Sequence, residues 1–231
     1  MKLYYAPGAC SFVPHCVLEL AGATFEPVLV KLHKGEQQTP DYLALNPRGQ
    51  VPVLVDTGPD GSDVITQITA IVQHLDARFP EAGVLPPPGL ARTRFLETLA
   101  WMNNTVHPTF THIFMPQKFT DQPEAQQAIR AHAVGQYRTL LQELESLCTR
   151  AAAAHAAGAL PGALPWLSGA HPGALDAYAL TFMRWGSMVG IDPAQFPALW
   201  ALAQRLVLVP AVARVVERER LQLNLYRPAE A

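Results

Sequence analysis

A proline-rich break divides this chain into two parts with different hydrophobic patterns. Before the break, about 80 residues alternate between strand-like and helix-like segments, whereas after it apolar residues recur only at helical spacing. The break itself holds three consecutive prolines at 86–88 and is expected to be extended and semi-rigid. The pattern therefore predicts an α/β domain over residues 1–80, a linker over 81–89 and an all-α domain over 90–231.

Turn and capping residues set the order of elements in the first part, which is strand, helix, strand, helix, strand, strand, helix. Ser11 is expected to cap the first helix and Gly22 to end it, while Thr39 begins the second. Enough chain separates the first two strands for a parallel crossover, and a hairpin turn over 56–63 joins the last two. A mixed four-stranded sheet with packed helices follows. The strands are expected at 2–6, 25–32, 51–55 and 64–66, and the last helix at 70–79.

The second part predicts only helices. Apolar residues recur at helical spacing in five segments, and each of the last three segments begins at Gly or Pro. A loop that contains Pro161, Gly162 and Pro165 interrupts the helices and is expected to be irregular. The helices are expected at 96–115, 122–157, 174–189, 197–209 and 210–221.

Composition and charge exclude several classes of protein. Hydrophobic residues make up 49% of the 231 residues, which suffices for a packed core, and a net charge of −2 provides no basic field for nucleic acid. Prolines break the longest uncharged stretch, 151–175, and the N-terminus lacks the apolar run of a signal peptide, so no membrane span is expected. Three cysteines without a Cys-x-x-Cys pair or zinc-type spacing indicate a reducing cytoplasm and no metal site.

Cys10 lies where the first strand turns into the first helix. Unpaired backbone N–H groups and the positive end of the helix dipole meet at such a position, and both lower the pKa of a thiol. This placement predicts a Cys10 that favours the thiolate. The alternative is that Cys10 is simply a small residue at a tight turn.

Two further corners fall at the same edge of the predicted sheet. Pro52 opens a central strand, where it has no N–H to donate to the hydrogen-bond ladder of the sheet. A cis Val51-Pro52 bond would leave the N–H and C=O of Val51 free to pair with an extended peptide. The alternative is a trans proline on an edge strand. At 66–71 a strand turns into a helix whose start can bind a carboxylate, unless Thr66 only caps it. The three corners together predict a short, extended, anionic peptide ligand that bears a thiol.

Three motifs resemble those of the cytosolic glutathione S-transferases. They are Tyr-Ala-Pro-Gly-Ala-Cys-Ser at 5–11, Asn-Pro-Arg-Gly-Gln-Val-Pro at 46–52 and Gln-Ile-Thr-Ala-Ile at 67–71, and the first is most similar to the bacterial Beta class. The resemblance covers essentially the whole chain and implies a thioredoxin-like N-terminal domain followed by an all-helical domain. It also implies a cytoplasmic, homodimeric detoxification transferase with glutathione as co-substrate and no metal.

The resemblance implies which residues hold glutathione. Val51 would clamp its cysteinyl backbone, with Pro52 in the cis form, and Gln67 with the residue after it would hold the γ-glutamyl end. Lys34 lies in the loop after the second strand and is expected to reach the glycyl carboxylate; the alternative is that this lysine is only solvated.

The resemblance also implies which residues act on the sulfur. Cys10 would face the glutathione sulfur, and Ser11 would supply a neighbouring donor. His107 matches the histidine of the first C-terminal helix that approaches the thiol in the Beta class, and His112 is the weaker candidate. Without the resemblance, His107 would be an ordinary histidine between domains.

The sequence departs from the family pattern at two positions. Ile68 stands where the family usually has Ser or Gly, so backbone N–H groups and Thr69 must replace a hydroxyl contact to the γ-glutamyl carboxylate. Loss of such a bond costs about 1.5–3 kcal/mol, or roughly ten- to a hundredfold in affinity. Gly173 stands at the cap of the helix that has Asp176 in its first turn. Asp176 is expected to accept from the Gly173 N–H, but the reciprocal hydroxyl bond of a capping box is missing.

Three functions follow from these residues. In the first, the start of the helix and the donors at Cys10 and Ser11 stabilise the glutathione thiolate, which attacks a small hydrophobic electrophile. In the second, Cys10 itself forms a mixed disulfide with glutathione; Cys16 is a poor resolving thiol because it is expected to be buried. In the third, Ile68 marks a carrier or interaction protein with weak glutathione binding.

The electrophile is expected to lie in a cleft between the domains. Apolar side chains of the first C-terminal helix and of the first N-terminal helix would line it, unless they belong to the core. The candidates are Phe12, Trp101, Phe110, Phe114 and Met115.

Overall fold

The computed structural model describes residues 1–58, 61–160 and 162–228. A four-stranded mixed sheet forms its N-terminal part, with strand order β2-β1-β3-β4. β1 pairs in parallel with β2, and β3 pairs with β4 in an antiparallel hairpin, as the sequence predicted. β3 also runs antiparallel to β1, a pairing that the sequence did not predict. The strands are β1 (Lys2–Tyr5), β2 (Glu26–Leu29), β3 (Val53–Gly58) and β4 (Gly61–Thr66).

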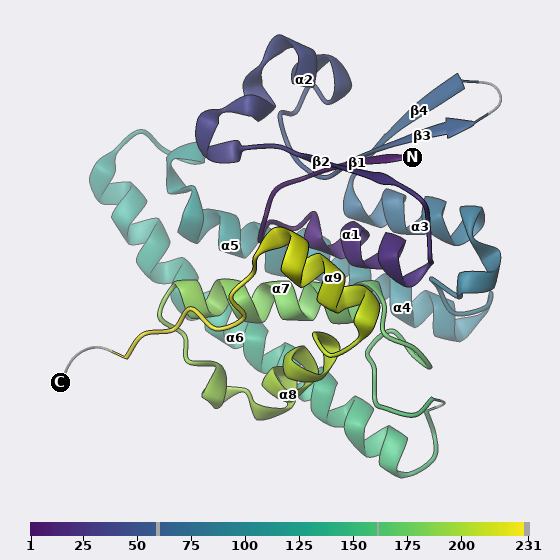
Figure 1. The fold of residues 1–231 in the computed structure, drawn as a ribbon. Helices are drawn as coiled ribbons and strands as arrows, with labels where there is room; N and C mark the ends of the chain where they lie inside the picture. The colour runs from purple at the N-terminus through teal and green to yellow at the C-terminus, as the bar shows by residue number, and fades with distance from the viewer. Residues whose placement is uncertain (59–60, 161, 229–231) are drawn as a thin grey trace.

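Helices cover both faces of this sheet (Figure 1): α2 (Pro40–Leu45) lies on one side, and α1 (Phe12–Leu20) and α3 (Ile68–Arg78) lie on the other. α1 ends where Gly22 takes a φ of +64°, and the Thr39 hydroxyl caps α2 by accepting from the Tyr42 N–H. The second strand is shorter than predicted because Leu32–Lys34 forms a 3-10 turn. Part of the predicted hairpin turn, Pro59 and Asp60, lies outside the described residues, as does Pro161.

The C-terminal part is helical, as predicted. Its first long helix is interrupted once, because Pro108 has no N–H to donate to the carbonyl of Asn104. One π turn, η4 (Met102–Val106), absorbs this gap, and the His107 N–H donates to the Met102 carbonyl. The helices are α4 (Leu90–Trp101), α5 (His107–Phe114), α6 (Pro123–Ala156), α7 (Ala174–Met188), α8 (Pro197–Leu206) and α9 (Pro210–Glu219).

The start of α7 shows how the chain replaces the missing cap hydroxyl. Asp176 is fully buried and accepts from the Gly173 N–H at 3.0 Å, as predicted, and also from the N–H groups of Leu167 and Ser168. The Ser168 hydroxyl accepts from the Leu175 N–H at 3.1 Å. A Cβ at Gly173 would lie 2.9 Å from the Ser168 side chain, so Gly173 leaves the space that this substitute cap needs.

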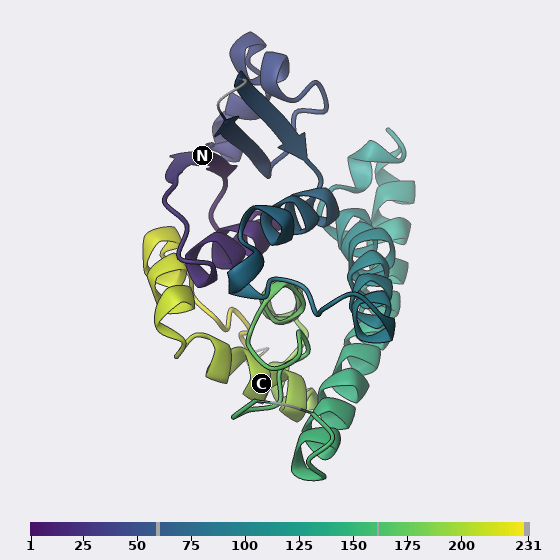
Figure 2. The same cartoon turned by 90° about the vertical axis from the view of Figure 1, so that its right-hand side faces the viewer.

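α7 connects the two parts of the molecule. α1 packs against α7 and α9, and Figure 1 shows α1 beneath the sheet, with α9 and α7 on the side of α1 away from it. Figure 2 shows the same helices in a view turned by 90° about the vertical axis. Buried side chains of both parts form one continuous apolar core. Among the described residues, no single helix is long and apolar enough to span a membrane; only α8 and α9 taken together meet that criterion, across a 90° bend.

Candidate functional site

The loop before β3 presents a backbone edge. The Val51-Pro52 peptide bond is cis, which confirms the prediction. Within the described residues the Val51 N–H has no hydrogen-bond acceptor, and the Val51 carbonyl accepts only from the Cys10 thiol, with 3.5 Å between Sγ and O. Val51 therefore offers the donor and acceptor that an extended peptide needs, close to a thiol.

The start of α3 lies immediately after β4, and Gln67 forms its N-cap with a φ of +72°. This left-handed conformation is costly for a residue with a side chain and is often found at functional sites. The N–H groups of Ile68, Thr69 and Ala70 have no acceptor among the described residues. The Gln67 side chain is exposed, whereas the Ile68 side chain is buried in the core, so Ile68 can contribute only its backbone.

Cys10 lies at the turn before α1 and is only 8% exposed. Burial raises the pKa of its thiol to about 12, although the N–H groups of Cys10 and Ser11 act in the opposite direction. The prediction that this position favours a Cys10 thiolate in the free protein is therefore wrong. Desolvation outweighs the start of the helix, and Cys10 is a neutral thiol that can donate a hydrogen bond.

Ser11 occupies the N-cap of α1 but does not cap it with its side chain. Its fully buried hydroxyl accepts from the Ala6 N–H at 3.1 Å and lies 3.2 Å from the Ala6 carbonyl, to which it donates. The side-chain cap predicted for Ser11 is wrong, because this hydroxyl closes the turn that carries Cys10. The donor role predicted for Ser11 stays a prediction, and its N–H is the group near the Cys10 thiol.

His107 follows the π turn and lies against α7. Its Nδ1 donates to the Tyr178 hydroxyl at 2.8 Å, and that hydroxyl donates to Asn103. Burial, followed by the charge of Lys118, lowers the pKa of His107 to about 4, so the ring is neutral near pH 7. Burial raises the pKa of Tyr178, and the negative charge of a Cys10 thiolate would raise it further.

The pKa of His107 predicts a measurable dependence of stability on pH. An unfolded histidine takes up its proton near pH 6.5 and folded His107 only near pH 4, so the unfolded state is favoured as the pH falls through this window. At pH 5 the difference corresponds to about 2 kcal/mol. Urea titrations at pH 7.5 and pH 5 measure how far the free energy of unfolding drops between these two pH values. This drop is expected to be smaller in His107→Gln than in the wild type, by about 2 kcal/mol. His33→Gln, at an exposed position, is the control; equal losses in wild type and His107→Gln would contradict the assignment.

The aromatic residues predicted to line an electrophile cleft separate into two groups. Phe110 stacks on Trp185 with ring centroids 4.5 Å apart and on Phe114, which is 59% exposed. Phe12 is 1% exposed and belongs to the core, so its prediction is wrong. Trp101 lines a different groove between α4 and α6, so its prediction is also wrong; the groove is lined by Glu97, Thr98, Trp101, Glu143, Ser146, Leu147 and Arg150.

Two further candidate site residues, Lys34 and His112, make few contacts with the other predicted site residues. Lys34 is exposed at the end of a 3-10 turn and has no ion-pair partner among the described residues. The Nδ1 of His112 donates to the Pro108 carbonyl, and its ring stacks on Phe119 at 4.0 Å. His112 therefore lacks the link to Tyr178 that His107 has. Cys16 is fully buried, as predicted.

Three residues of the helical part contact the site and were missed from the sequence. Tyr178 and Trp185 lie two turns apart on α7; the first holds His107, and the indole N–H of the second donates to the Gly8 carbonyl at 2.9 Å. Their seven-residue spacing on an apolar helix was the available signal. Glu219, which accepts from the Gly8 N–H at 2.9 Å, had no signal because charged residues surround it in the sequence.

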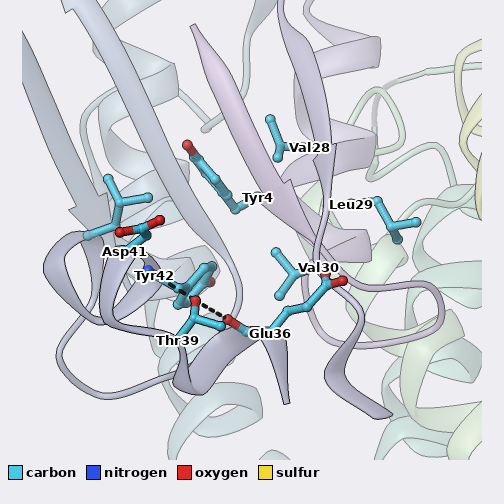
Figure 3. Close-up of a pocket in the computed structure, with 9 residues that line it drawn as sticks. Tyr4, Val28, Leu29, Val30, Glu36, Thr39, Asp41 and Tyr42 are labelled. Atoms are coloured by element: carbon cyan, nitrogen blue, oxygen red, sulfur yellow. Dashed lines mark hydrogen bonds between the residues drawn. The ribbon is translucent and has the colours of Figure 1, made fainter. Parts of the chain in front are cut away.

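A depression lies between the sheet and α2 (Figure 3), apart from the corner described above. In it, the Thr39 hydroxyl donates to the Glu36 carbonyl at 2.8 Å. No residue predicted to contact glutathione lines it; its lining is Tyr4, Val28, Leu29, Val30, Glu36, Thr39, Asp41, Tyr42 and Leu45. The described residues contain no group of three or more metal-ligating side chains.

A thioredoxin-like sheet with a cis-proline corner, followed by a helical domain, is the architecture that the motif resemblance implied, and comparison with known proteins agrees. Residues 1–77 match the family described as glutathione S-transferase, N-terminal domain. The chain is 33% identical over 224 residues to glutathione S-transferase GST-4.5 of Xanthomonas campestris pv. campestris. The aligned region covers 96% of this chain and 100% of that relative.

Solved structures show the same fold. A sphingomonad glutathione S-transferase complexed with glutathione is 30% identical with a TM-score of 0.75, covering 96% of this chain and 100% of the other. A bacterial beta class glutathione S-transferase of Sphingomonas chungbukensis is 28% identical, with the same TM-score and coverage. The chain belongs to the glutathione S-transferase family, and the resemblance inferred from its motifs is confirmed.

Proposed function

We propose that this protein conjugates the glutathione thiolate to small hydrophobic electrophiles. The observation that carries the proposal is the juxtaposition of the Cys10 thiol with Val51, whose carbonyl lies 3.5 Å from Sγ and whose N–H has no acceptor among the described residues. A cysteinyl peptide laid along Val51 brings its own sulfur to this corner. The sphingomonad relative solved with glutathione supports this choice of ligand.

Each end of glutathione has a matching group in this proposal. The γ-glutamyl carboxylate binds the unpaired N–H groups at the start of α3, with the Gln67 side chain and the Thr69 hydroxyl as further donors. Ile68 adds only its N–H, because its side chain is buried. Lys34 attracts the glycyl carboxylate from the loop after β2.

The sulfur is stabilised by a donor that stays protonated. In the free protein the Cys10 thiol donates to the Val51 carbonyl; with glutathione bound, that carbonyl accepts from the cysteinyl N–H and the Cys10 thiol turns to the glutathione thiolate. A hydrogen bond to a charged sulfur lowers the pKa of glutathione from its ordinary value near 8.5. Neutral His107, held by Tyr178, completes this side of the site.

The electrophile binds beside the exposed Phe114 ring, which stacks on Phe110, with Met115 next to it. The protein acts as a homodimer in the cytoplasm, where this chemistry removes reactive compounds. The family relatives named above support the transferase assignment.

Two other functions correspond to specific observations. Thiol-disulfide exchange requires a Cys10 thiolate, and the pKa of about 12 disfavours it. A non-enzymatic carrier with weak glutathione binding corresponds to the buried Ile68, which supplies no hydroxyl. Calorimetry with reduced glutathione distinguishes the carrier from the transferase. A dissociation constant in the micromolar range supports the transferase, and one in the millimolar range supports the carrier.

Replacement of Cys10 tests the conjugation mechanism. Cys10→Ala removes the donor to the thiolate, so kcat/KM with a generic aromatic halide is expected to fall by about ten- to a hundredfold at pH 6.5, in line with a lost bond to a charged group. The deficit is expected to shrink as the pH rises above the pKa of free glutathione.

Cys148→Ala is the matched control, since Cys148 is a buried cysteine of α6. Unchanged turnover in Cys10→Ala would overturn the role of this thiol. Intact mass after treatment with oxidised glutathione is expected to show no adduct on Cys10, and a stoichiometric adduct would favour the exchange reaction instead.

A further inference from the structure

Gly8 is held on several sides by the helical part of the molecule. Its N–H donates to Oε2 of Glu219 at 2.9 Å, and its carbonyl accepts from the Trp185 indole at 2.9 Å. The Arg184 guanidinium lies over its Cα, where an added Cβ would approach within 2.6 Å. Gly8 lies two residues before Cys10, so these contacts, here called the Gly8 clamp, hold the turn that carries the thiol.

Glu219 is the charged member of the Gly8 clamp and lies at the end of α9. It is 3% exposed, and its Oε1 accepts from Nδ1 of fully buried His15 at 2.8 Å. Nε2 of His15 accepts from Arg218 at 3.0 Å, and Arg218 pairs with Glu19 of α1. The carboxylate thus has defined partners on both oxygens, and its orientation is fixed by α1 as well as by α9.

The charge of Glu219 also acts on the thiol electrostatically. Burial raises the pKa of both Cys10 and Tyr5, and the charge of Glu219 raises each of them further. It also acts on Arg184, whose pKa burial lowers and Glu219 raises. A carboxylate at this place is unfavourable for a nucleophilic cysteine and favourable for one that must keep its proton.

We propose that Glu219 is a positioning residue that holds the Gly8 turn and keeps Cys10 as a hydrogen-bond donor rather than a nucleophile. This inference rests on the proposed function, in which the Cys10 thiol donates to the glutathione thiolate. It adds a carboxylate of the last helix, 209 positions from Cys10 in the sequence, to the burial that keeps this thiol protonated.

Alkylation of Cys10 tests the inference without glutathione and without enzymatic turnover. Glu219→Gln keeps the size of the side chain and removes its charge. The rate at which iodoacetamide alkylates Cys10 near pH 8, resolved by peptide mass spectrometry, is expected to rise at least threefold in this variant. Alkylation of buried Cys148 is expected not to change, which excludes general unfolding. Glu217→Gln, an exposed neighbour on α9, is the matched control and is expected to behave as the wild type.

A double-substitution cycle separates positioning from other effects. Glu219→Gln alone is expected to lower kcat/KM for conjugation and to have no further effect in a Cys10→Ala background. An equal loss in both backgrounds, or an unchanged alkylation rate of Cys10, would overturn the inference. Failure of the proposed transferase function leaves the alkylation result interpretable, because that assay needs no turnover.

A measurement on the wild type covers the case in which Glu219→Gln does not fold. Hydrogen exchange of the Gly8 amide is expected to be slow, because its N–H donates to a buried carboxylate. Fast exchange of this amide, at the rate of an unprotected turn, would show that the Gly8 clamp does not form and would overturn the inference.

Discussion

Asp176→Ala is expected to lower the free energy of unfolding by about 3–5 kcal/mol, the largest effect on stability in this chain. The Asp176 carboxylate is fully buried and accepts from three backbone N–H groups at 2.7–3.2 Å, as well as from the Ser168 hydroxyl. Burial raises the pKa of Asp176, and these hydrogen bonds act against that rise. Alanine leaves the donors of the loop and of the α7 start without an acceptor.

Urea titration measures this loss, and Asp192→Ala provides the matched control. Asp192 caps a short 3-10 turn through one bond to Ala194 and is partly exposed, so its loss is expected to cost about 1 kcal/mol. Asp176→Asn keeps an acceptor oxygen and is expected to fall between the two. A cost for Asp176→Ala no greater than that for Asp192→Ala would contradict the central place given to this carboxylate.

Gly8→Val is expected to have the largest effect on activity without removing any group that touches glutathione. Gly8 has a φ of +69°, which costs a side-chain-bearing residue about 1–2 kcal/mol, and its Cβ would meet Arg184, whose Nε is held by the Gln222 carbonyl. The turn must shift, and a displacement of Cys10 by about 1 Å is expected to lower kcat/KM for conjugation by roughly a hundredfold.

Gly22→Val is the control that isolates the backbone cost. Gly22 has a φ of +64° at the end of α1, and no atom outside its chain neighbours lies within 4 Å of an added Cβ. This variant is expected to lose about 1–2 kcal/mol of stability and to retain activity. If both variants keep wild-type kcat/KM, the position of the Cys10 turn does not limit the reaction.

Local signals in the sequence predicted the sheet and its helices. Thr39 and Gly22 determine helix ends through bonds between near neighbours, and such features are readable from a short window. The cis bond at Pro52 was implied by the family resemblance, because the Val51-Pro52 dipeptide alone leaves a trans proline on an edge strand as an alternative. The interrupted helix before His107 was missed, although Pro108 was its cause and was visible in the sequence.

The environment of Cys10 could not be predicted from its neighbours in the chain. The sequence places the thiol at the start of a helix, which lowers its pKa, but burial is a property of the whole fold and acts more strongly in the opposite direction. Glu219 and Trp185 contact Gly8 from positions 211 and 177 residues away. Ser168 replaces the cap hydroxyl that position 173 lacks, and no rule of local spacing predicts that substitution.

A crystal structure of this protein with reduced glutathione bound is the most direct test of where the tripeptide lies. We expect its cysteinyl N–H and C=O to pair with the backbone of Val51, and the Cys10 thiol to leave the Val51 carbonyl and contact the ligand's sulfur. A complex in which Cys10 still donates to Val51 while the tripeptide occupies another surface, such as the depression beside α2, would contradict this expectation.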